Sequence, residues 1–236
     1  MAIALINSSG KIAASGPSNG SNCTFNATGS NLVVSGGAQG NFGSGALAAI
    51  TPSDSLTNTW TSLTKREGFT SWRSAAQLFY VLSPSVGSGQ TFNVSSSDNT
   101  AIGAAGFSGV AAFGAESAGG TSAGTTTQPG SLTPSEDGCL LIAFLCYCRN
   151  TGDPTVTIDN SFTILYQGAS NGQYVACFAY KVQTTAAAIN PTWTHDNDFG
   201  SSVPSVSTMA YWTPAASATL PGPRNYRQAV KRASFY

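Results

Sequence analysis

Residues 139–148 read CLLIAFLCYC, an apolar run without the alternation of a strand that has one face in water. A strand that is apolar at every position is covered on both faces. The run is much shorter than the ~20 residues that a membrane-spanning helix needs, so it predicts a strand deep inside a β-sheet. One face is expected to meet the core of a sandwich. For the other face we expect a loop, the N-terminal segment or, as the leading interpretation, a second copy of the chain.

Further runs of aromatic and β-branched residues lie between Gly, Asn, Ser and Pro, and no long stretch keeps the 3.6-residue period of an amphipathic helix. Many short strands with frequent turn residues indicate an all-β sandwich or barrel. The expected strands are 31–35, 58–64, 75–83, 90–95, 101–107, 138–149, 154–158, 161–167, 173–184, 191–194 and 205–213.

The same series of strands occurs twice along the chain. An Asp-led turn into an aromatic strand, DSLTNTWTSL at 54–63, corresponds to IDNSFTIL at 158–165. The next strand, AAQLFYVLSP at 75–84, corresponds to YVACFAYKVQ at 174–183. Such internal similarity indicates two related structural units.

We therefore expect a jelly-roll-like β-sandwich over 31–212, built from sequence-related halves at 31–114 and 138–212. The stretch 115–137 has the Gly/Ser/Thr/Pro composition of a linker. A core shared by the two halves is the favoured interpretation, and two small domains with separate cores also fit the length.

Both ends of the chain are expected to be arms. Residues 1–30 would form an N-terminal arm with the first strands, and residues 213–236 an extended C-terminal arm. The latter is interpreted either as a disordered tail or as an arm that docks on a neighbour. Its candidate contact residues are basic and aromatic: Arg224, Tyr226, Arg227, Lys231, Arg232, Phe235 and Tyr236.

Charged residues make up only 8% of the chain, against ~25% in a typical globular domain. The formal net charge is zero, yet residues 224–236 hold four bases and no acid, which leaves −4 on the rest. Nucleic-acid binding proteins usually have a basic face, and the negative net charge of the rest of the chain gives no sign of one. We therefore expect no nucleic-acid partner. The basic C-terminal segment suits an acidic protein surface.

The opening residues, MAIALI, lack a charged first region, and their apolar stretch is shorter than the ~7–15 residues typical of an export signal. The sequence therefore predicts a soluble protein made in the cytoplasm, without export and without membrane association.

No catalytic or metal-binding pattern is evident. The cysteines, Cys23, Cys139, Cys146, Cys148 and Cys177, are odd in number and lack paired spacings, so buried free thiols are expected ahead of a disulfide or a metal site. The single histidine, His195, is expected in a solvated loop, because no Gly-x-Ser-x-Gly elbow accompanies it. Asp196 and Asp198 lack the spacing of a calcium loop. We expect a non-enzymatic protein without cofactor or metal.

Of the tryptophans, Trp60, Trp193 and Trp212 fit the strand pattern as core residues. Trp72 follows a Gly-Phe-Thr-Ser loop beside Arg73, and these two residues are the best contact candidates in the body of the protein.

The order of an apolar strand, DSLTNTWTSL at 54–63, LFYVLSP at 78–84 and QTFNVSSSDNTAIGAAGFSG at 90–109 resembles β-sandwich modules of phage structural proteins and of bacterial secreted proteins. The resemblance extends from about Asn31 to Pro214, and its motifs are structural. It implies a bacteriophage virion protein, above all a capsid decoration or cement protein. Such a protein would form a homo-oligomer, for example a trimer, and dock on the major capsid protein or another virion protein. The alternatives are a tail or fibre protein, or an adhesin that binds glycan through loop aromatics such as Trp72.

Overall fold

The computed structural model describes residues 1–12, 21–41, 45–69, 72–148, 155–170, 174–196 and 204–216. Within these ranges all regular elements are β-strands, which confirms the predicted all-β sandwich. In this described part, no helix is present that could cross a membrane.

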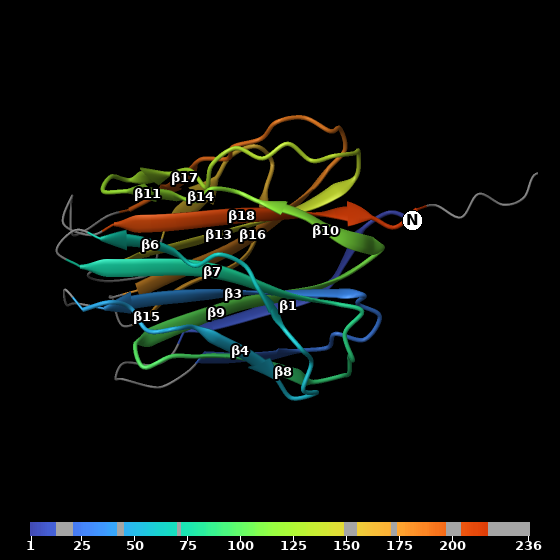
Figure 1. Ribbon diagram of the computed structural model, residues 1–236, viewed down its shortest axis with the longest axis horizontal. Helices are drawn as coiled ribbons and strands as arrows, with labels where there is room; N and C mark the ends of the chain where they lie inside the picture. The colour runs from blue at the N-terminus through green and yellow to red at the C-terminus, as the bar shows by residue number, and fades with distance from the viewer. Residues whose placement is uncertain are drawn as a thin grey trace, which may run out of the picture.

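The strands form two large inner sheets and two small outer sheets that stack as four layers. Figure 1 shows these layers from top to bottom as β17 and β14, then β18, β13 and β16, then β7, β3, β9 and β1, and last β4 and β8. Inner sheet 1 has the order β1 (Ala4–Ile12), β9 (Asn99–Ser108), β3 (Leu32–Asn41), β7 (Arg73–Leu82) and β5 (Thr61–Ser62), with β6 (Arg66–Phe69) also on β7. Inner sheet 2 has the order β10 (Val110–Glu116), β18 (Ser205–Pro214), β13 (Cys139–Cys148), β16 (Tyr174–Gln183) and β15 (Thr163–Ser170), with β11 (Gly120–Ser122) also on β18.

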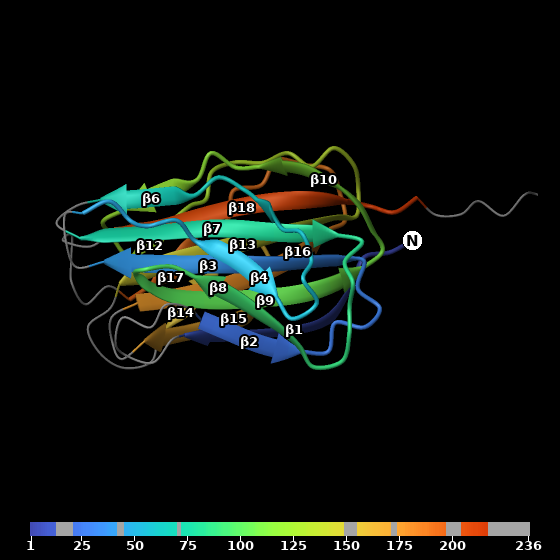
Figure 2. The ribbon, with the colours of Figure 1, turned by 60° about the horizontal axis from the view of Figure 1, so that its bottom comes forward.

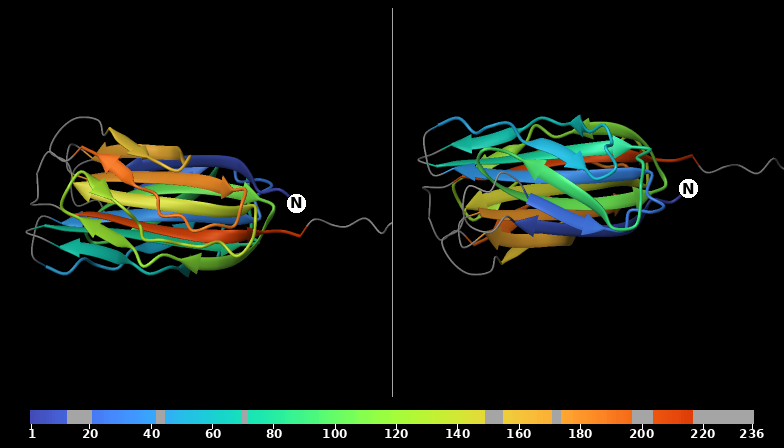
Figure 3. Two further views of the ribbon diagram at one scale, coloured as in Figure 1. Left: turned by 90° about the horizontal axis from the view of Figure 1, so that it is seen from above. Right: turned by 90° about the horizontal axis from the view of Figure 1, so that it is seen from below.

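Each inner sheet carries one outer sheet, as the views from below and above show (Figures 2 and 3). Outer sheet 1 has the order β2 (Ser21–Phe25), β8 (Gln90–Ser95) and β4 (Thr51–Asp54). Outer sheet 2 has the order β12 (Thr126–Thr127), β17 (Trp193–His195) and β14 (Val156–Ile158).

The strand order is the same in the two halves of the chain. β1-β9-β3-β7 over β2-β8-β4 is repeated as β10-β18-β13-β16 over β12-β17-β14. The registers match too, because Leu32 lies opposite Leu82 and Phe107, as Leu140 lies opposite Val182 and Trp212. Each half is thus an antiparallel double sheet with jelly-roll topology, and the two halves pack through their inner sheets.

The stretch 115–137, expected as a linker, holds the end of β10 and the strands β11 and β12. These strands occupy the places that β1 and β2 take in the first half, so the stretch belongs to the second jelly roll. The first half therefore spans 4–108 and the second 110–214.

Three cores separate the four layers. The central core lies between the inner sheets and contains Leu32, Val34, Leu78, Phe107, Leu140, Ile142, Phe144, Phe178 and Trp212. A second core fills the first half and contains Phe25, Val33, Phe79, Phe92 and Ile102. A third fills the second half and contains Leu141, Leu145, Val175, Trp193 and Met209. Each half therefore has a core of its own, and the halves share a further one.

Burial of the layers explains the sequence patterns. Strands of the outer sheets alternate, as in β2 with Cys23 and Phe25 inward, because one face is in water. β13 does not alternate, because Phe144 points into the central core and Leu145 into the second-half core. The prediction that this strand is covered on both faces is confirmed. The expected cover by a second copy is wrong, since outer sheet 2 of the same chain provides it.

Glycines of inner sheet 1 accommodate aromatic rings of inner sheet 2. A Cβ on Gly36 would lie 2.5 Å from Phe144 Cδ2, and one on Gly103 would lie 2.8 Å from Phe178 Cβ. Gly40 meets the ring of Tyr174 in the same way. Because a methyl group at these positions would overlap a ring, the close approach of the two sheets requires glycine here.

Candidate partner-contact surface

The hairpin of β6 and β7 holds the contact candidates that lie in the described residues. Arg73 is the first residue of β7 and pairs with Phe69 of β6 across the hairpin. Trp72 directly precedes β7 and is partly exposed. The other candidates, Arg224, Tyr226, Arg227, Lys231, Arg232, Phe235 and Tyr236, lie outside the described residues.

Arg73 forms a stacked pair with an exposed aromatic ring. Its guanidinium carbon lies 4.4 Å from the centroid of Phe69, whose side chain is 55% exposed. A carboxylate oxygen of Glu67 lies 3.7 Å from the same guanidinium group, and Glu67 also pairs with Lys65 at 2.6 Å. A cation over an exposed ring contributes about 0.5–1 kcal/mol. The pair places a partly buried cation, 22% exposed, over an exposed ring, and we call it the Phe69–Arg73 platform.

Sequence reasoning selected Trp72 and Arg73 but missed Phe69. The signal was Glu67, because alternate residues of a strand share a face and a carboxylate usually lies on the exposed one. In the structure Glu67 and Phe69 are both exposed and Gly68 between them is buried. Large exposed apolar side chains are a typical feature of contact sites.

The base of this hairpin is fixed to the second half of the molecule. Gly68 packs closely against Pro204 and Val206. A Cβ added to Gly68 would lie only 2.7 Å from Pro204 Cβ. Arg66 donates to the carbonyl oxygen of Ser117 at 2.7 Å, and the backbone N–H of Thr64 donates to Glu116 at 2.9 Å. The platform is therefore held by contacts with both jelly rolls.

The remaining tryptophans are packed. Trp193 and Trp212 are fully buried, as predicted. Trp60 is half-buried against the first-half core, and its indole N–H donates to Asp54 at 2.8 Å. Asp54 also accepts from the backbone N–H of Leu56 at 2.8 Å, which is the turn-forming role expected of such a carboxylate.

The prediction of a solvated loop for His195 is wrong, because this residue lies in β17 and is only 3% exposed. Its ring stacks on Tyr147 at 4.3 Å between centroids. Nδ1 lies 3.2 Å from the carbonyl oxygen of Asp196, and Nε2 lies 3.3 Å from the hydroxyl of Thr127, which in turn contacts the hydroxyl of Ser205. The burial of His195 could not be predicted from the sequence, because β17 has only three residues and His195 is the last of them.

In the neutral ring, Nδ1–H donates to the Asp196 carbonyl, because a carbonyl oxygen only accepts, and Nε2 faces the Thr127 hydroxyl. The Ser205 hydroxyl donates to the Ser122 carbonyl at 3.1 Å, so a proton on Nε2 would have the Thr127 oxygen as its acceptor. The cost of protonation is therefore the burial of a charge. Burial lowers the pKa of His195, and the backbone carbonyl and negative charge of Asp196 oppose this shift only in part.

We expect the free energy of unfolding to fall as the pH drops below about 6.5, the ordinary pKa of histidine. Between that value and the lower pKa of the folded state, the unfolded chain binds more protons, so stability rises with pH there. Each unit by which the pKa is lowered corresponds to about 1.4 kcal/mol. Urea unfolding of the wild type and of His195→Gln between pH 7.5 and 5 measures the effect, and the variant should have the flatter profile. Equal slopes for the two proteins would contradict the assignment.

The cysteines with described side chains are buried free thiols, as predicted: Cys23, Cys139, Cys146 and Cys177. Desolvation raises the pKa of Cys23 and of Cys146 to about 12. Such thiols are poor nucleophiles at neutral pH. Among the residues that the structure describes, no group of three His, Cys, Asp or Glu side chains is placed to hold a metal ion.

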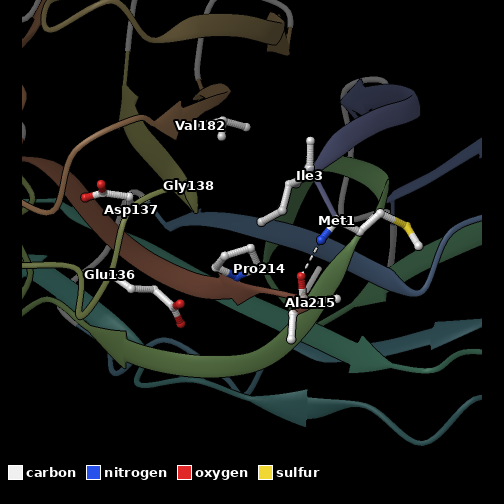
Figure 4. Close-up of a pocket in the computed structure, with 10 residues that line it drawn as sticks. Met1, Ile3, Glu136, Asp137, Gly138, Val182, Pro214 and Ala215 are labelled. Carbon is white, nitrogen blue, oxygen red and sulfur yellow. Dashed lines mark hydrogen bonds between the residues drawn. The ribbon is translucent and has the colours of Figure 1, made fainter. Parts of the chain in front are cut away.

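A cavity of about 440 Å³ lies at the end of the sandwich where both termini of the described body meet (Figure 4). The Met1 ammonium donates to the Ala215 carbonyl at 2.6 Å, and the Ala215 N–H donates to the Gly109 carbonyl at 2.7 Å. Figure 4 shows Glu136 and Asp137 on one side of the cavity and Met1 with Ile3 on the other. The cavity therefore has two carboxylates on one side and apolar side chains, together with the Met1 ammonium, on the other.

Comparisons with family models, with curated proteins and with solved structures give no match for this chain.

Proposed function

We propose that this chain is a non-enzymatic structural protein of a bacteriophage particle, a decoration or cement protein that associates with copies of itself and docks on the coat. The observation that carries the proposal is the position of the basic C-terminal segment. The described body ends at Ala216, beside Met1, so the segment leaves the sandwich at one defined end. A body attached by one end leaves its opposite end free to project from a particle.

The rest of the body supports a docking role. Two jelly rolls that share a central core form a stiff unit, because the inner sheets bury apolar side chains on both faces. The low content of charged residues and the Phe69–Arg73 platform suit contacts with other protein surfaces. Arg and aromatic side chains are the residue types that most often dominate such contacts.

A glycan-binding adhesin, or a tail or fibre protein, is the second candidate. The Phe69 ring is 55% exposed and Trp72 is partly exposed. These rings favour this candidate, because flat aromatic faces stack on apolar sugar faces. A glycan array with the wild type and with Phe69→Ala separates the two functions. Glycan binding that the substitution removes would favour the adhesin.

Deletion of residues 217–236 is expected to reduce attachment to particles at least about tenfold, which corresponds to about 1.4 kcal/mol. β18 ends at Pro214, so the deletion spares every strand of the body. The measurement is co-sedimentation of the purified protein with particles of the encoding phage that lack it.

A variant with glutamine at Arg224, Arg227, Lys231 and Arg232 is the matched control, since it keeps the length of the segment and removes its charge. It should bind as weakly as the deletion and lose its dependence on salt. Absence of the wild-type chain from purified particles, or attachment of the deletion variant at full strength, would overturn the proposal.

A further inference from the structure

The cavity between the termini has the chemistry of a site for a basic, aromatic peptide. Glu136 and Asp137 both precede β13 and are exposed. Asp137 has one carboxylate oxygen fixed by the backbone N–H of Ala186 at 2.7 Å. Across the cavity, Ile3 and Pro214 provide apolar surface (Figure 4). At about 440 Å³, the cavity lies within the ~300–1,000 Å³ typical of ligand pockets.

The cavity carries a net negative charge. Its carboxylates outnumber its single cation, the Met1 ammonium, and that cation is bonded to the Ala215 carbonyl at 2.6 Å. A ligand that brings two positive charges and one aromatic ring would complement both sides.

The chain itself supplies a segment with this chemistry. Residues 224–227 read Arg-Asn-Tyr-Arg, with one base on each side of an aromatic residue. Ala216 lines the cavity, so the C-terminal segment starts at its rim. From there to Arg224 the chain can span at most about 27 Å. Pro-Gly-Pro at 221–223 is a sequence typical of a turn, so a chain of this length could return to the cavity.

We propose that this cavity binds the C-terminal segment of its own chain, with Arg224 and Arg227 against Glu136 and Asp137 and with Tyr226 on the apolar surface across from them. A short tether gives the segment a local concentration in the millimolar range, which favours the same chain over a second copy. The body then holds its basic segment until a more acidic surface competes for it.

Two measurements on the free, full-length protein test the proposal. In the first, trypsin cleavage after Arg224 and Arg227 is followed with time. Docking predicts that Glu136→Gln with Asp137→Asn accelerates this cleavage about tenfold, and that high salt does the same in the wild type. Asparagine at 137 keeps the acceptor for Ala186. Glu67→Gln, which removes an acid far from the cavity, is the control and should leave the rate unchanged.

In the second measurement, a carbodiimide joins carboxylates to amines that touch them, in the wild type and in Arg224→Lys. A link from residue 224 or Lys231 to Glu136 or Asp137 is expected. An equal mixture of ¹⁴N- and ¹⁵N-labelled protein should give links within one isotope only. Links of mixed isotope would assign the segment to a second copy and overturn the proposal, as would equal cleavage of the wild type and the double variant. Both measurements use the free protein without phage particles, so their outcome is independent of the proposed attachment to a coat.

Discussion

Replacement of Gly36 by valine is expected to lower the free energy of unfolding by about 3 kcal/mol, the upper part of the usual range for overpacking a core. A Cβ at this position lies 2.5 Å from Phe144 Cδ2 and 2.8 Å from its Cγ, so the whole ring must move. Phe144 is fully buried among the side chains of the central core. Valine is the better strand former, but that preference is smaller than the steric cost.

Phe144→Ala tests whether the ring is the cause. Alone, this substitution should cost about 3–5 kcal/mol, because it leaves a cavity between the inner sheets. In the double variant the valine occupies part of that cavity. The combined cost should therefore fall below the sum of the two single costs by more than the ~0.5 kcal/mol expected of independent sites. Chemical denaturation of all four proteins gives the coupling.

Gly45→Ala is the control, because no atom lies within 4 Å of a Cβ built at Gly45. Its effect should stay within about 0.5 kcal/mol. If Gly36→Val and Phe144→Ala prove additive, the two residues do not form the contact described above.

These glycines also explain a limit of sequence reasoning. The expected strand 31–35 continues in the structure as β3 through Gly36, Gly37 and Gly40 to Asn41. Glycine lowers the strand propensity of a sequence, and the reason for Gly36 and Gly40 is an aromatic ring more than a hundred residues away in the chain. Local pattern carries no information about such a partner.

Every expected strand overlaps an observed one, and 90–95 has the observed bounds of β8. The strands without a counterpart among the expectations are β1, β2, β4, β6 and β10 to β12. Several of these have only two to five residues. β10 lies at a sheet edge with an irregular register. A short or edge strand buries few apolar side chains, so its sequence resembles a polar loop, as in the stretch 115–137.

The contact surface was predictable only in part. Arg73 could be selected because it lies next to Trp72 in a polar loop, whereas its stacking on Phe69 depends on the pairing register of β6 and β7. His195 was misplaced for a related reason. Its partners Tyr147, Thr127 and Ser205 come from other strands, and His195 is buried only when these strands pack together.

Separated at Gly109, the two halves are not expected to fold as stable monomers. Their shared core is the reason, since the second half alone would expose Leu140, Ile142, Phe144, Phe178 and Trp212 to water. Each such side chain contributes about 1.5–3 kcal/mol when buried. Five of them contribute roughly 10 kcal/mol, which is comparable with the ~5–15 kcal/mol that stabilises a whole domain.

The test is expression of residues 1–108 and 109–216, separately and together. Alone, the second fragment should aggregate or form large oligomers, because its inner sheet is the more apolar of the two. The first fragment has Gly36, Gly103, Ala76 and Ala105 among Leu32, Val34, Leu78 and Phe107 on the corresponding face and should aggregate less. Together they should give a 1:1 complex by size-exclusion chromatography, with one cooperative unfolding transition. Two monomeric fragments with sharp transitions of their own would show that the separate cores suffice. In that case the central core would be an interface between two domains, and the duplicated halves would be able to move against one another.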